Sequence, residues 1–477
     1  MRSSQGMRFC RFGRTRQLKI GSAADLEGVL ELEEAHWVAT AAPIEMINCD
    51  STFLKLLDTD HNGRILCFEL KDAITWLLGL FSQTEGITAG SETLSLDSLK
   101  AGSSEADRVR KACLNVLVEL GSSDAGEISL QQVRKVKAEI ENSPISETGV
   151  VLSEAADDED TRQFICDVVS TMGGVDHPTG KKGVNESQLE KFYSEAEAYL
   201  ALQDVAVHHT DDAESQQQFS VAALGVEKVR KYLDEKYHRS VDALIAQSGR
   251  TAARLADVRL IEKVILYQMY LLDFANNFVS FPHLYDPNKR AMFEMGTLIM
   301  DGRRFNFSVK VFDRSVHSNV AKSGNMFVLY VEVLPSDGQR YEIAVPVTSG
   351  GRGNLYVGKR GIFLDITGRE SDAKVVQIVE NPISLSEALI SPFRRLGRTL
   401  TGKIESLTAT AEKKLDAAVS TVVEPTAGKA NRSLLAGGLL MGGGVALAAL
   451  GSAVAYIAKT LSGVPAWKIL VGIAGAI

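Results

Sequence analysis

A run of twelve residues, 58–69, constrains the fold of this chain more than any other stretch, and it reads D-T-D-H-N-G-R-I-L-C-F-E. Side-chain oxygens stand at its first, third and fifth positions, and a glutamate closes it at the twelfth. Oxygen donors gathered on a short bend suit a hard divalent cation. Gly63 occupies the sixth position, where a sharp turn through a left-handed conformation would penalise a Cβ atom. The alternative is a solvated turn between two helices, but such a turn gives no reason for the closing glutamate.

The residues on both sides of this run predict two helices. Asp50 can cap the entering helix, and each helix carries apolar residues at helical spacing. These residues are Phe53, Leu56 and Leu57 before the run, and Phe68, Leu70, Ile74 and Leu77 after it. Helix, loop and helix in this order resemble the EF-hand of the calmodulin-like calcium-binding superfamily. The resemblance is confined to the N-terminal part of the chain.

The EF-hand resemblance implies Ca²⁺ as the cofactor and assigns its ligands. The side chains of Asp58, Asp60 and Asn62, the backbone carbonyl of Arg64 and both carboxylate oxygens of Glu69 would bind the ion. In this family the apolar eighth residue, here Ile65, joins a neighbouring loop through a short β-bridge. Leu66 at the ninth position replaces a polar residue that often binds through water. The expected affinity is therefore modest, with a Kd on the order of 10⁻⁶ to 10⁻⁴ M.

Two further stretches resemble degenerate copies of this loop. Residues 121–132 keep a glycine, Gly126, and a bridge residue, Ile128, but have lost the carboxylates. Their liganding places hold Gly121, Ser123, Ala125 and Gln132. Residues 174–188 keep a bridge residue at Val184 but contain a proline, two lysines and no closing glutamate. Neither copy is expected to bind calcium, and both support one EF-hand-like helical domain over residues 18–200, because EF-hands pair through their bridges.

Three other segments surround or follow this domain. Residues 1–17 predict a disordered basic arm. Residues 201–285 predict a helical connector, whose second helix, 256–278, is apolar around most of its circumference and is therefore expected to be central. From residue 290 to 382 the apolar period becomes alternating, and glycines mark the corners, with Asp-Gly at 301–302 as a hairpin turn. This pattern predicts a small antiparallel β-barrel or sandwich.

The C-terminal part predicts a stem and a membrane anchor. Residues 384–424 are amphipathic with an eleven-residue repeat, which fits a self-associating, coiled-coil-like stem or a helix on a membrane surface. Residues 434–461 carry no charge before Lys459 and exceed the roughly twenty residues that span a bilayer core, so they predict a transmembrane helix. Residues 464–477 begin a second apolar segment, which is either re-entrant or continues into a second transmembrane helix. The run 353–384 is similar to stretches of uncharacterised bacterial membrane-anchored proteins with EF-hand-like N-termini.

Composition excludes several classes of protein. A net charge of −8 and a pI near 5.7 argue against a nucleic-acid partner. Five cysteines are scattered without CxxC spacing, which indicates free thiols in a reducing compartment. Neither a Ser/His/Asp arrangement nor a nucleotide motif stands out in the sequence, so we do not expect an enzyme.

Together these patterns predict a multidomain α+β protein, with an EF-hand-like helical domain, a helical connector, a small β-barrel or sandwich, a stem helix and a transmembrane segment. The predicted location is the cell membrane, with a C-terminal anchor and cytoplasmic N-terminal domains. The predicted function is a calcium-responsive scaffold or adaptor, with calcium, the lipid bilayer and a protein partner or second copy as its partners. The alternative is a structural oligomeric membrane scaffold or channel-like subunit in which calcium is a permanently bound structural ion.

Overall fold

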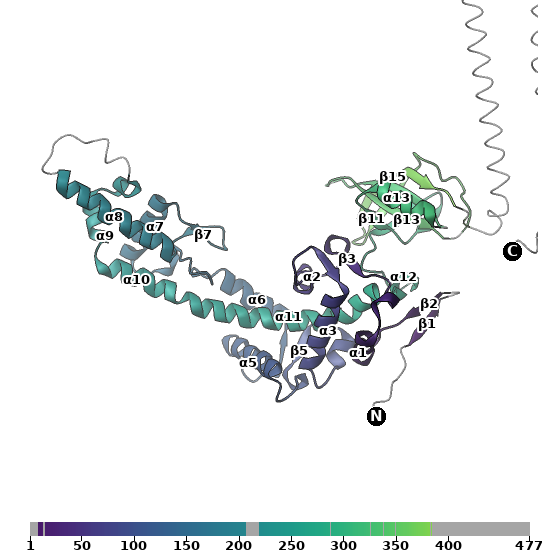
Figure 1. Cartoon of the computed structure of the whole chain (residues 1–477), viewed down its shortest axis with the longest axis horizontal. Coiled ribbons are helices and arrows are strands. Elements are labelled where there is room, and N and C mark those ends of the chain that lie inside the picture. Colours follow the sequence, from purple (N-terminus) through teal and green to yellow (C-terminus); the bar gives the residue numbers. More distant parts are fainter. Residues whose placement is uncertain are drawn as a thin grey trace, which may run out of the picture. The chain divides into compact units, whose positions relative to one another are not determined.

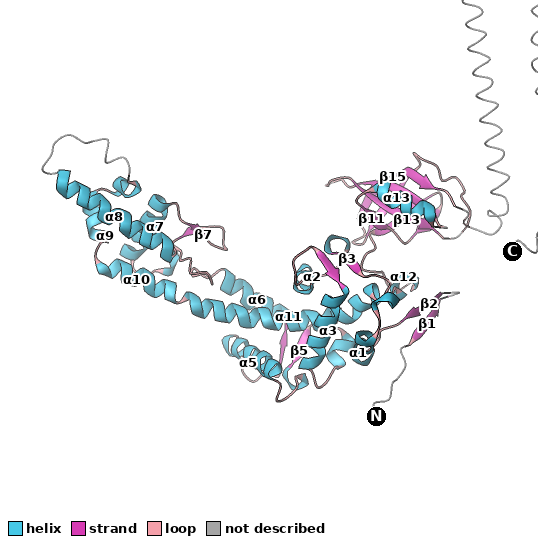
Figure 2. Cartoon of the chain, in the orientation of Figure 1, coloured by secondary structure: helices cyan, strands magenta, loops and turns pink. Residues whose placement is uncertain are grey.

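The computed structural model describes residues 8–383, except for 13–14, 207–218 and the single positions 287, 325, 337, 349 and 382. The chain divides into two compact units, Met1–Glu387 and Ala388–Ile477, and every described residue lies in the first. Figure 1 shows this unit with many of its helices and strands labelled, and Figure 2 colours them by type. Within the predicted N-terminal arm, β1 (Phe9–Phe12) and β2 (Thr15–Leu18) pair as an antiparallel hairpin.

The first helical body contains the loop 58–69 and two short two-stranded sheets. In each sheet the eighth residue of a loop pairs with a strand that precedes that loop in the chain: Ile65 with Ala42, and Ile128 with Leu94. The elements are α1 (Ala23–Glu31), β3 (Ala41–Pro43), α2 (Ser51–Leu57), β4 (Arg64–Leu66), α3 (Cys67–Leu80), α4 (Glu85–Ala89), β5 (Thr93–Ser95), α5 (Ser104–Glu119), β6 (Glu127–Ser129) and α6 (Leu130–Glu141). Short 3₁₀ turns lie at Glu34–His36, Ile44–Met46 and Leu96–Ser98.

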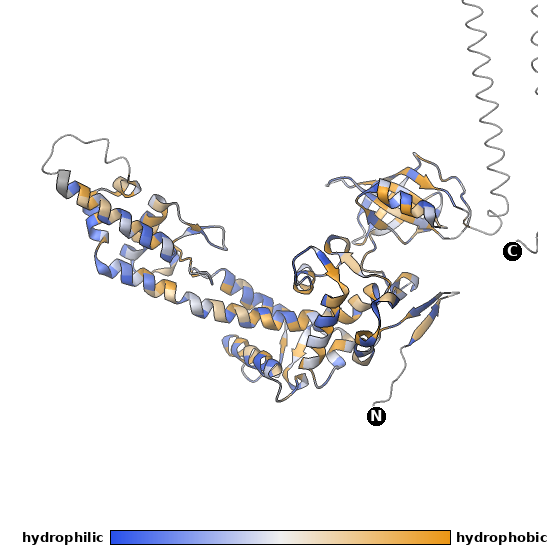
Figure 3. Cartoon of the chain, viewed as in Figure 1, coloured by the Kyte–Doolittle hydropathy of each residue, from blue (hydrophilic) through white to orange (hydrophobic). Residues whose placement is uncertain are grey.

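The core of this body is built around α11 (Ser248–Phe278), a helix from a distant part of the sequence. Its residues from Leu255 to Phe278 share one continuous apolar core with the helices α1–α6. Figure 3 shows hydrophobic residues along the part of α11 that lies among these helices. The apolar surface of α11 extends around most of the helix, and burial on several sides covers that surface.

A second helical core holds residues between Ile145 and Val241. Here Val184, the bridge residue of the loop 174–188, pairs with Val151. Asp158 caps α7 by accepting a hydrogen bond from the backbone N–H of Thr161, which supplies a partner that the first turn of a helix otherwise lacks. The elements are α7 (Glu159–Met172), β7 (Val175–Asp176), β8 (Lys182–Gly183), α8 (Glu186–Ala206), α9 (Val226–Tyr232) and α10 (Glu235–Ala246), with 3₁₀ turns at Ser153–Ala155 and Ser220–Leu224. The predicted connector 201–285 therefore contributes to both helical cores.

After α12 (Pro282–Tyr285) the chain forms one seven-stranded antiparallel sheet in the order β10-β9-β14-β15-β12-β13-β11. The strands are β9 (Gly296–Met300), β10 (Arg303–Phe305), β11 (Val309–Val311), β12 (Phe327–Leu334), β13 (Tyr341–Val347), β14 (Arg360–Asp365) and β15 (Glu370–Val379). The predicted turn is present, with Asp301 and Gly302 both at positive φ between β9 and β10. A helix, α13 (Arg314–Ser323), packs on one face of the sheet through Ala321.

The prediction of a barrel or sandwich is wrong. A barrel requires the first and last strands to pair, but β10 and β11 are the two separate edges of this curled sheet. The hairpin predicted around the turn at 301–302 is short in the structure. Its second strand, β10, has three residues, and the next strand, β11, joins β13 at the far edge of the sheet.

The membrane prediction also requires correction. Within the described ranges, no helix is long and apolar enough to cross a bilayer. The longest of them, α11, carries charged residues such as Arg254, Glu262 and Lys263 along its length. The described residues therefore give no support to the predicted membrane-anchored fold or to the cell-membrane location, and the fold class is corrected to a mixed helical and sheet architecture with one seven-stranded sheet. The stem 384–424, the span 434–461 and the segment 464–477 lie outside the described residues.

Candidate metal site in the loop 58–69

The loop backbone turns back on itself between the end of α2 at Leu57 and the start of α3 at Cys67. Two of its residues have left-handed backbone conformations, His61 with φ 56° and Gly63 with φ 76°. A Cβ atom at Gly63 would meet no other atom within 4 Å, so the glycine is required by the backbone conformation and not by crowding.

Three carboxylates converge inside this turn. One oxygen from each of Asp58, Asp60 and Glu69 lies within 4.8 Å of the other two. Asp58 is 5 % exposed and Glu69 is 1 % exposed, whereas Asp60 faces solvent. No lysine or arginine of the described residues forms an ion pair with any of the three. Buried carboxylates without a cationic partner are unfavourable, and a bound cation would compensate for them.

Backbone N–H groups hold the two buried carboxylates in place. Asp58 accepts hydrogen bonds from the N–H groups of Asn62 at 3.1 Å and Gly63 at 3.0 Å. Glu69 reaches back across the loop, where it accepts from the N–H of Thr59 at 2.6 Å and from that of Leu66 at 2.9 Å. The first and last residues of the loop are therefore oriented toward one point by local bonds.

The two other predicted ligands lie differently. The side-chain oxygen of Asn62 accepts a hydrogen bond from the N–H of Arg64 at 2.8 Å, and its amide nitrogen donates to Asp60 at 2.8 Å. The side chain of Arg64 is exposed, and its predicted role involves only its backbone carbonyl. The structure thus brings together Asp58, Asp60 and Glu69, and it places Asn62 beside them as a partner of Asp60.

Among the described residues, the loops 121–132 and 174–188 do not form a comparable cluster. The lysines of the loop 174–188 are paired with acids, Lys182 with Asp176 at 2.6 Å and Lys181 with Glu154. His177 in the same loop is buried, with its Nδ1 atom 2.9 Å from the hydroxyl of Thr179. Burial lowers the pKa of this imidazole, which favours its neutral form.

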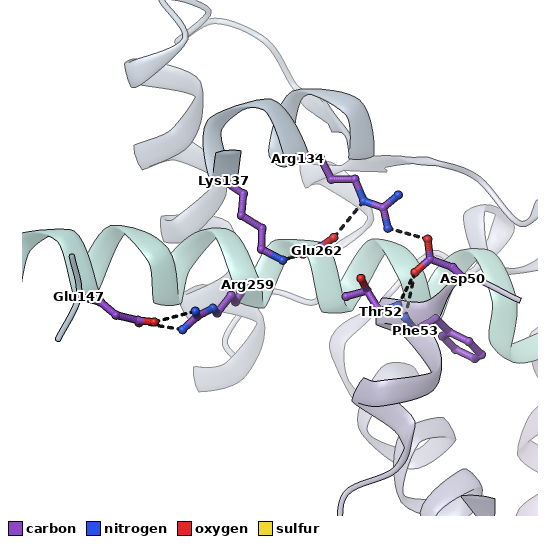
Figure 4. A network of polar contacts seen from close by, with 8 residues as sticks. All are labelled: Asp50, Thr52, Phe53, Arg134, Lys137, Glu147, Arg259 and Glu262. Carbon is purple, nitrogen blue, oxygen red and sulfur yellow. Dashed lines mark hydrogen bonds and ion pairs between the residues drawn. The ribbon is translucent and has the colours of Figure 1, made fainter. Parts of the chain in front are cut away.

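A polar network holds the start of α2 (Figure 4). The sequence predicted that Asp50 caps this helix, but it did not predict the partners on α6 and α11. Asp50 caps α2 by accepting from the N–H groups of Thr52 at 2.9 Å and Phe53 at 3.0 Å. Its second oxygen lies 2.7 Å from an Arg134 nitrogen on α6. Burial acts to raise the pKa of Asp50, but the Arg134 guanidinium and the capping N–H groups outweigh burial and hold that pKa below its ordinary value.

The network continues from α6 to α11. Arg134 also contacts Glu262 at 3.0 Å, and Lys137 contacts the other oxygen of Glu262 at 2.7 Å. Glu262 is only 3 % exposed, so its charge depends on these two cations. No sequence pattern indicates this network, because each of its ion pairs joins residues that are more than eighty positions apart.

These features define a candidate cation site in a helix–loop–helix unit that is packed against a long central helix. Neither a protein family model, nor a curated protein, nor a solved structure matches this chain. The geometry of the site is therefore the basis on which its function is inferred.

Proposed function

We propose that this protein binds Ca²⁺ at the loop 58–69 and acts as a calcium-binding scaffold or adaptor. The observation that carries this proposal is the convergence of Asp58, Asp60 and Glu69 on one point between two helices. Like charges brought together out of water repel one another, and a divalent cation between them removes that penalty.

The donor set favours calcium over other metals. All the converging groups are carboxylates, which suit hard cations, whereas zinc and copper sites use nitrogen or sulfur ligands. Mg²⁺ prefers near-ideal octahedral geometry, keeps several of its waters and usually takes only one or two carboxylates. A twelve-residue loop with a closing glutamate fits the larger and more flexible coordination shell of Ca²⁺.

Isothermal titration calorimetry on the full chain tests the site. We expect wild type to bind Ca²⁺ with a Kd on the order of 10⁻⁶ to 10⁻⁴ M and to bind Mg²⁺ more weakly. Glu69→Gln removes the closing carboxylate charge and should weaken Ca²⁺ binding by at least about tenfold. Glu85→Gln is the matched control, because Glu85 is also a first-turn glutamate but is exposed on α4. Absence of calcium heat in wild type, or equal binding by wild type and Glu69→Gln, would remove the proposal.

The packing around the loop favours a structural ion over a switching one. A calcium sensor exposes apolar surface when it binds the ion. Here the apolar faces of α2 and α3 share a core with α11 of the same chain. A structural ion should raise the melting temperature and leave the fluorescence of the dye ANS unchanged, whereas a responsive adaptor should bind more ANS with calcium.

A further inference from the structure

One side chain of α11 touches both helices of the candidate site. The ring of Tyr267 makes edge contacts with Phe53 of α2, at 6.0 Å between centroids, and with Trp76 of α3, at 5.6 Å. Its hydroxyl donates a hydrogen bond of 2.7 Å to the backbone carbonyl of Leu56. Tyr267 is 2 % exposed, so it fills the space between the entering and the exiting helix.

The position of the Leu56 bond links Tyr267 to the site. The last carbonyls of a helix have no partner within that helix. Leu56 is the second-last residue of α2, two positions before the first proposed ligand, Asp58. The Tyr267 hydroxyl therefore satisfies a free carbonyl at the point where the chain leaves α2 and enters the loop. Trp76 lies on α3, whose first turn carries the last proposed ligand, Glu69.

The same helix also holds the other end of α2. Glu262 of α11 binds Arg134, and Arg134 binds the capping residue Asp50 (Figure 4). Glu262 and Tyr267 thus fix the start and the end of α2 from one helix. The direction of α2 therefore depends on how α11 packs against it, and the position of Asp58 depends on the direction of α2.

Electrostatics agree with this geometry. Burial, and after it the negative charge of Glu69, raise the pKa of Tyr267 above its ordinary value. The hydroxyl therefore stays protonated and remains a hydrogen-bond donor at physiological pH.

We infer that Tyr267 is a positioning residue of the loop 58–69. Through Tyr267, cation binding in the loop is coupled to the packing of α11 against α2 and α3. This inference rests on the proposed function, since it concerns the same site. Coupling of this kind is reciprocal: if α11 holds the loop in its binding geometry, a bound cation strengthens the attachment of α11 to the same degree.

The test compares two identical chemical changes on α11 in the full chain. Tyr267→Phe deletes the hydroxyl that binds Leu56 and keeps the ring. Tyr270→Phe is the control, because the Tyr270 ring also contacts Phe53, at 5.3 Å between centroids, and the substitution also removes one hydroxyl from α11. Calorimetry with calcium chloride should give a Kd about fivefold higher for Tyr267→Phe, as expected for one net hydrogen bond, and a Kd within about twofold of wild type for Tyr270→Phe.

A second readout separates positioning from a purely structural role. Melting temperatures are measured for each variant in excess calcium and in EDTA. For a positioning residue, the rise in melting temperature caused by calcium is smaller in Tyr267→Phe than in wild type. A purely structural residue lowers both melting temperatures equally and leaves the calcium Kd unchanged, and that result would overturn the inference.

The outcomes also distinguish this inference from the proposed function. If wild type binds no calcium, both fail together. If wild type binds calcium and Tyr267→Phe binds it equally well, the inference alone fails. Equal weakening in both tyrosine variants would also refute it, because the effect would then not depend on the bond to Leu56.

Discussion

The buried charge of Glu262 offers a direct measure of how firmly α11 is attached to the first helical body. We consider Glu262→Gln, which keeps the size of the side chain and removes its charge. The perturbed contacts are the 3.0 Å contact with Arg134 and the 2.7 Å contact with Lys137. The remaining cations both lie on α6, so the substitution weakens the attachment of α11 to α6.

The expected loss follows from burial and screening. A hydrogen bond to a charged group contributes about 1.5–3 kcal/mol, so two such bonds would give about 3–6 kcal/mol when fully buried. Arg134 is exposed and Lys137 is half-buried, so solvent screens both cations and reduces this value. Glutamine also retains one weaker hydrogen bond. We therefore expect the free energy of unfolding of this body to fall by about 2 kcal/mol.

Urea unfolding followed by tryptophan fluorescence measures this loss. Trp37 contacts Phe278 and Trp76 contacts Tyr267, so both report the seating of α11. The third tryptophan, Trp467, lies outside the described residues and is replaced by phenylalanine in every sample. The transition midpoint should fall without a change in slope, which indicates that stability and not compactness has changed.

Glu147→Gln is the matched control, because Glu147 forms a bidentate ion pair with Arg259, which like Glu262 lies on α11 (Figure 4). Each of the two hydrogen bonds measures 2.8 Å. Arg259 is exposed and Glu147 is half-buried, so solvent screens this pair and its loss should change stability by less than about 1 kcal/mol. Equal losses in the two variants, or a loss below about 0.5 kcal/mol for Glu262→Gln, would contradict the conclusion that the buried network holds α11.

Two further predictions concern the loop and its entering helix. The pKa of Asp50 is lower in the folded protein than in the unfolded chain. The charged form of Asp50 therefore stabilises the fold at pH values above the unfolded pKa of about 3.9. This stabilisation is lost as the pH falls through the lower pKa of the folded state. Wild type should therefore be more stable than Asp50→Asn at pH 7. Chemical denaturation at a series of pH values should show that this difference in the free energy of unfolding shrinks toward pH 3. A difference that is constant with pH would refute the stabilising role of the Asp50 charge. Gly63→Ala places a Cβ in the left-handed region and should destabilise the loop by about 1–2 kcal/mol while weakening calcium binding, as measured by thermal unfolding and calorimetry. Its control, Gly79→Ala, lies in α3 with open space around the new atom and should be neutral or stabilising; a loss as large as that of Gly63→Ala would show that glycine replacement in general is harmful.

The loop 58–69 could be predicted from the sequence because its interactions are local. Asp58 binds the N–H groups of residues four and five positions later, and Glu69 binds groups within ten positions of itself. The Asp-Gly turn at 301–302 was predictable for the same reason, since the turn depends on the backbone freedom of two adjacent residues. In each case the residue type and its spacing contain the required physical information.

The partners of the bridge residues could be anticipated only in part. Apolar residues at positions 65, 128 and 184 indicated that each of three loops would form a β-bridge. We expected loops to pair with one another, but Ile65 and Ile128 pair with short strands that precede their loops, and Val184 pairs with Val151 in an isolated bridge. Spacing identifies a residue that needs a partner, whereas chain topology decides which strand reaches it.

The sequence by itself determined the acidic loop, its glycine and the two helices beside it, because neighbouring residues encode these features. Only the tertiary structure decided that α11 fills the centre of the first body, that Tyr267 contacts both helices of the loop, and that Glu262 meets Arg134. These contacts join residues 211 and 128 positions apart, and no periodic pattern records which distant side chain will occupy a given space. The open sheet was decided in the same way, because alternation indicates where strands form, whereas closure depends on whether the two edge strands meet.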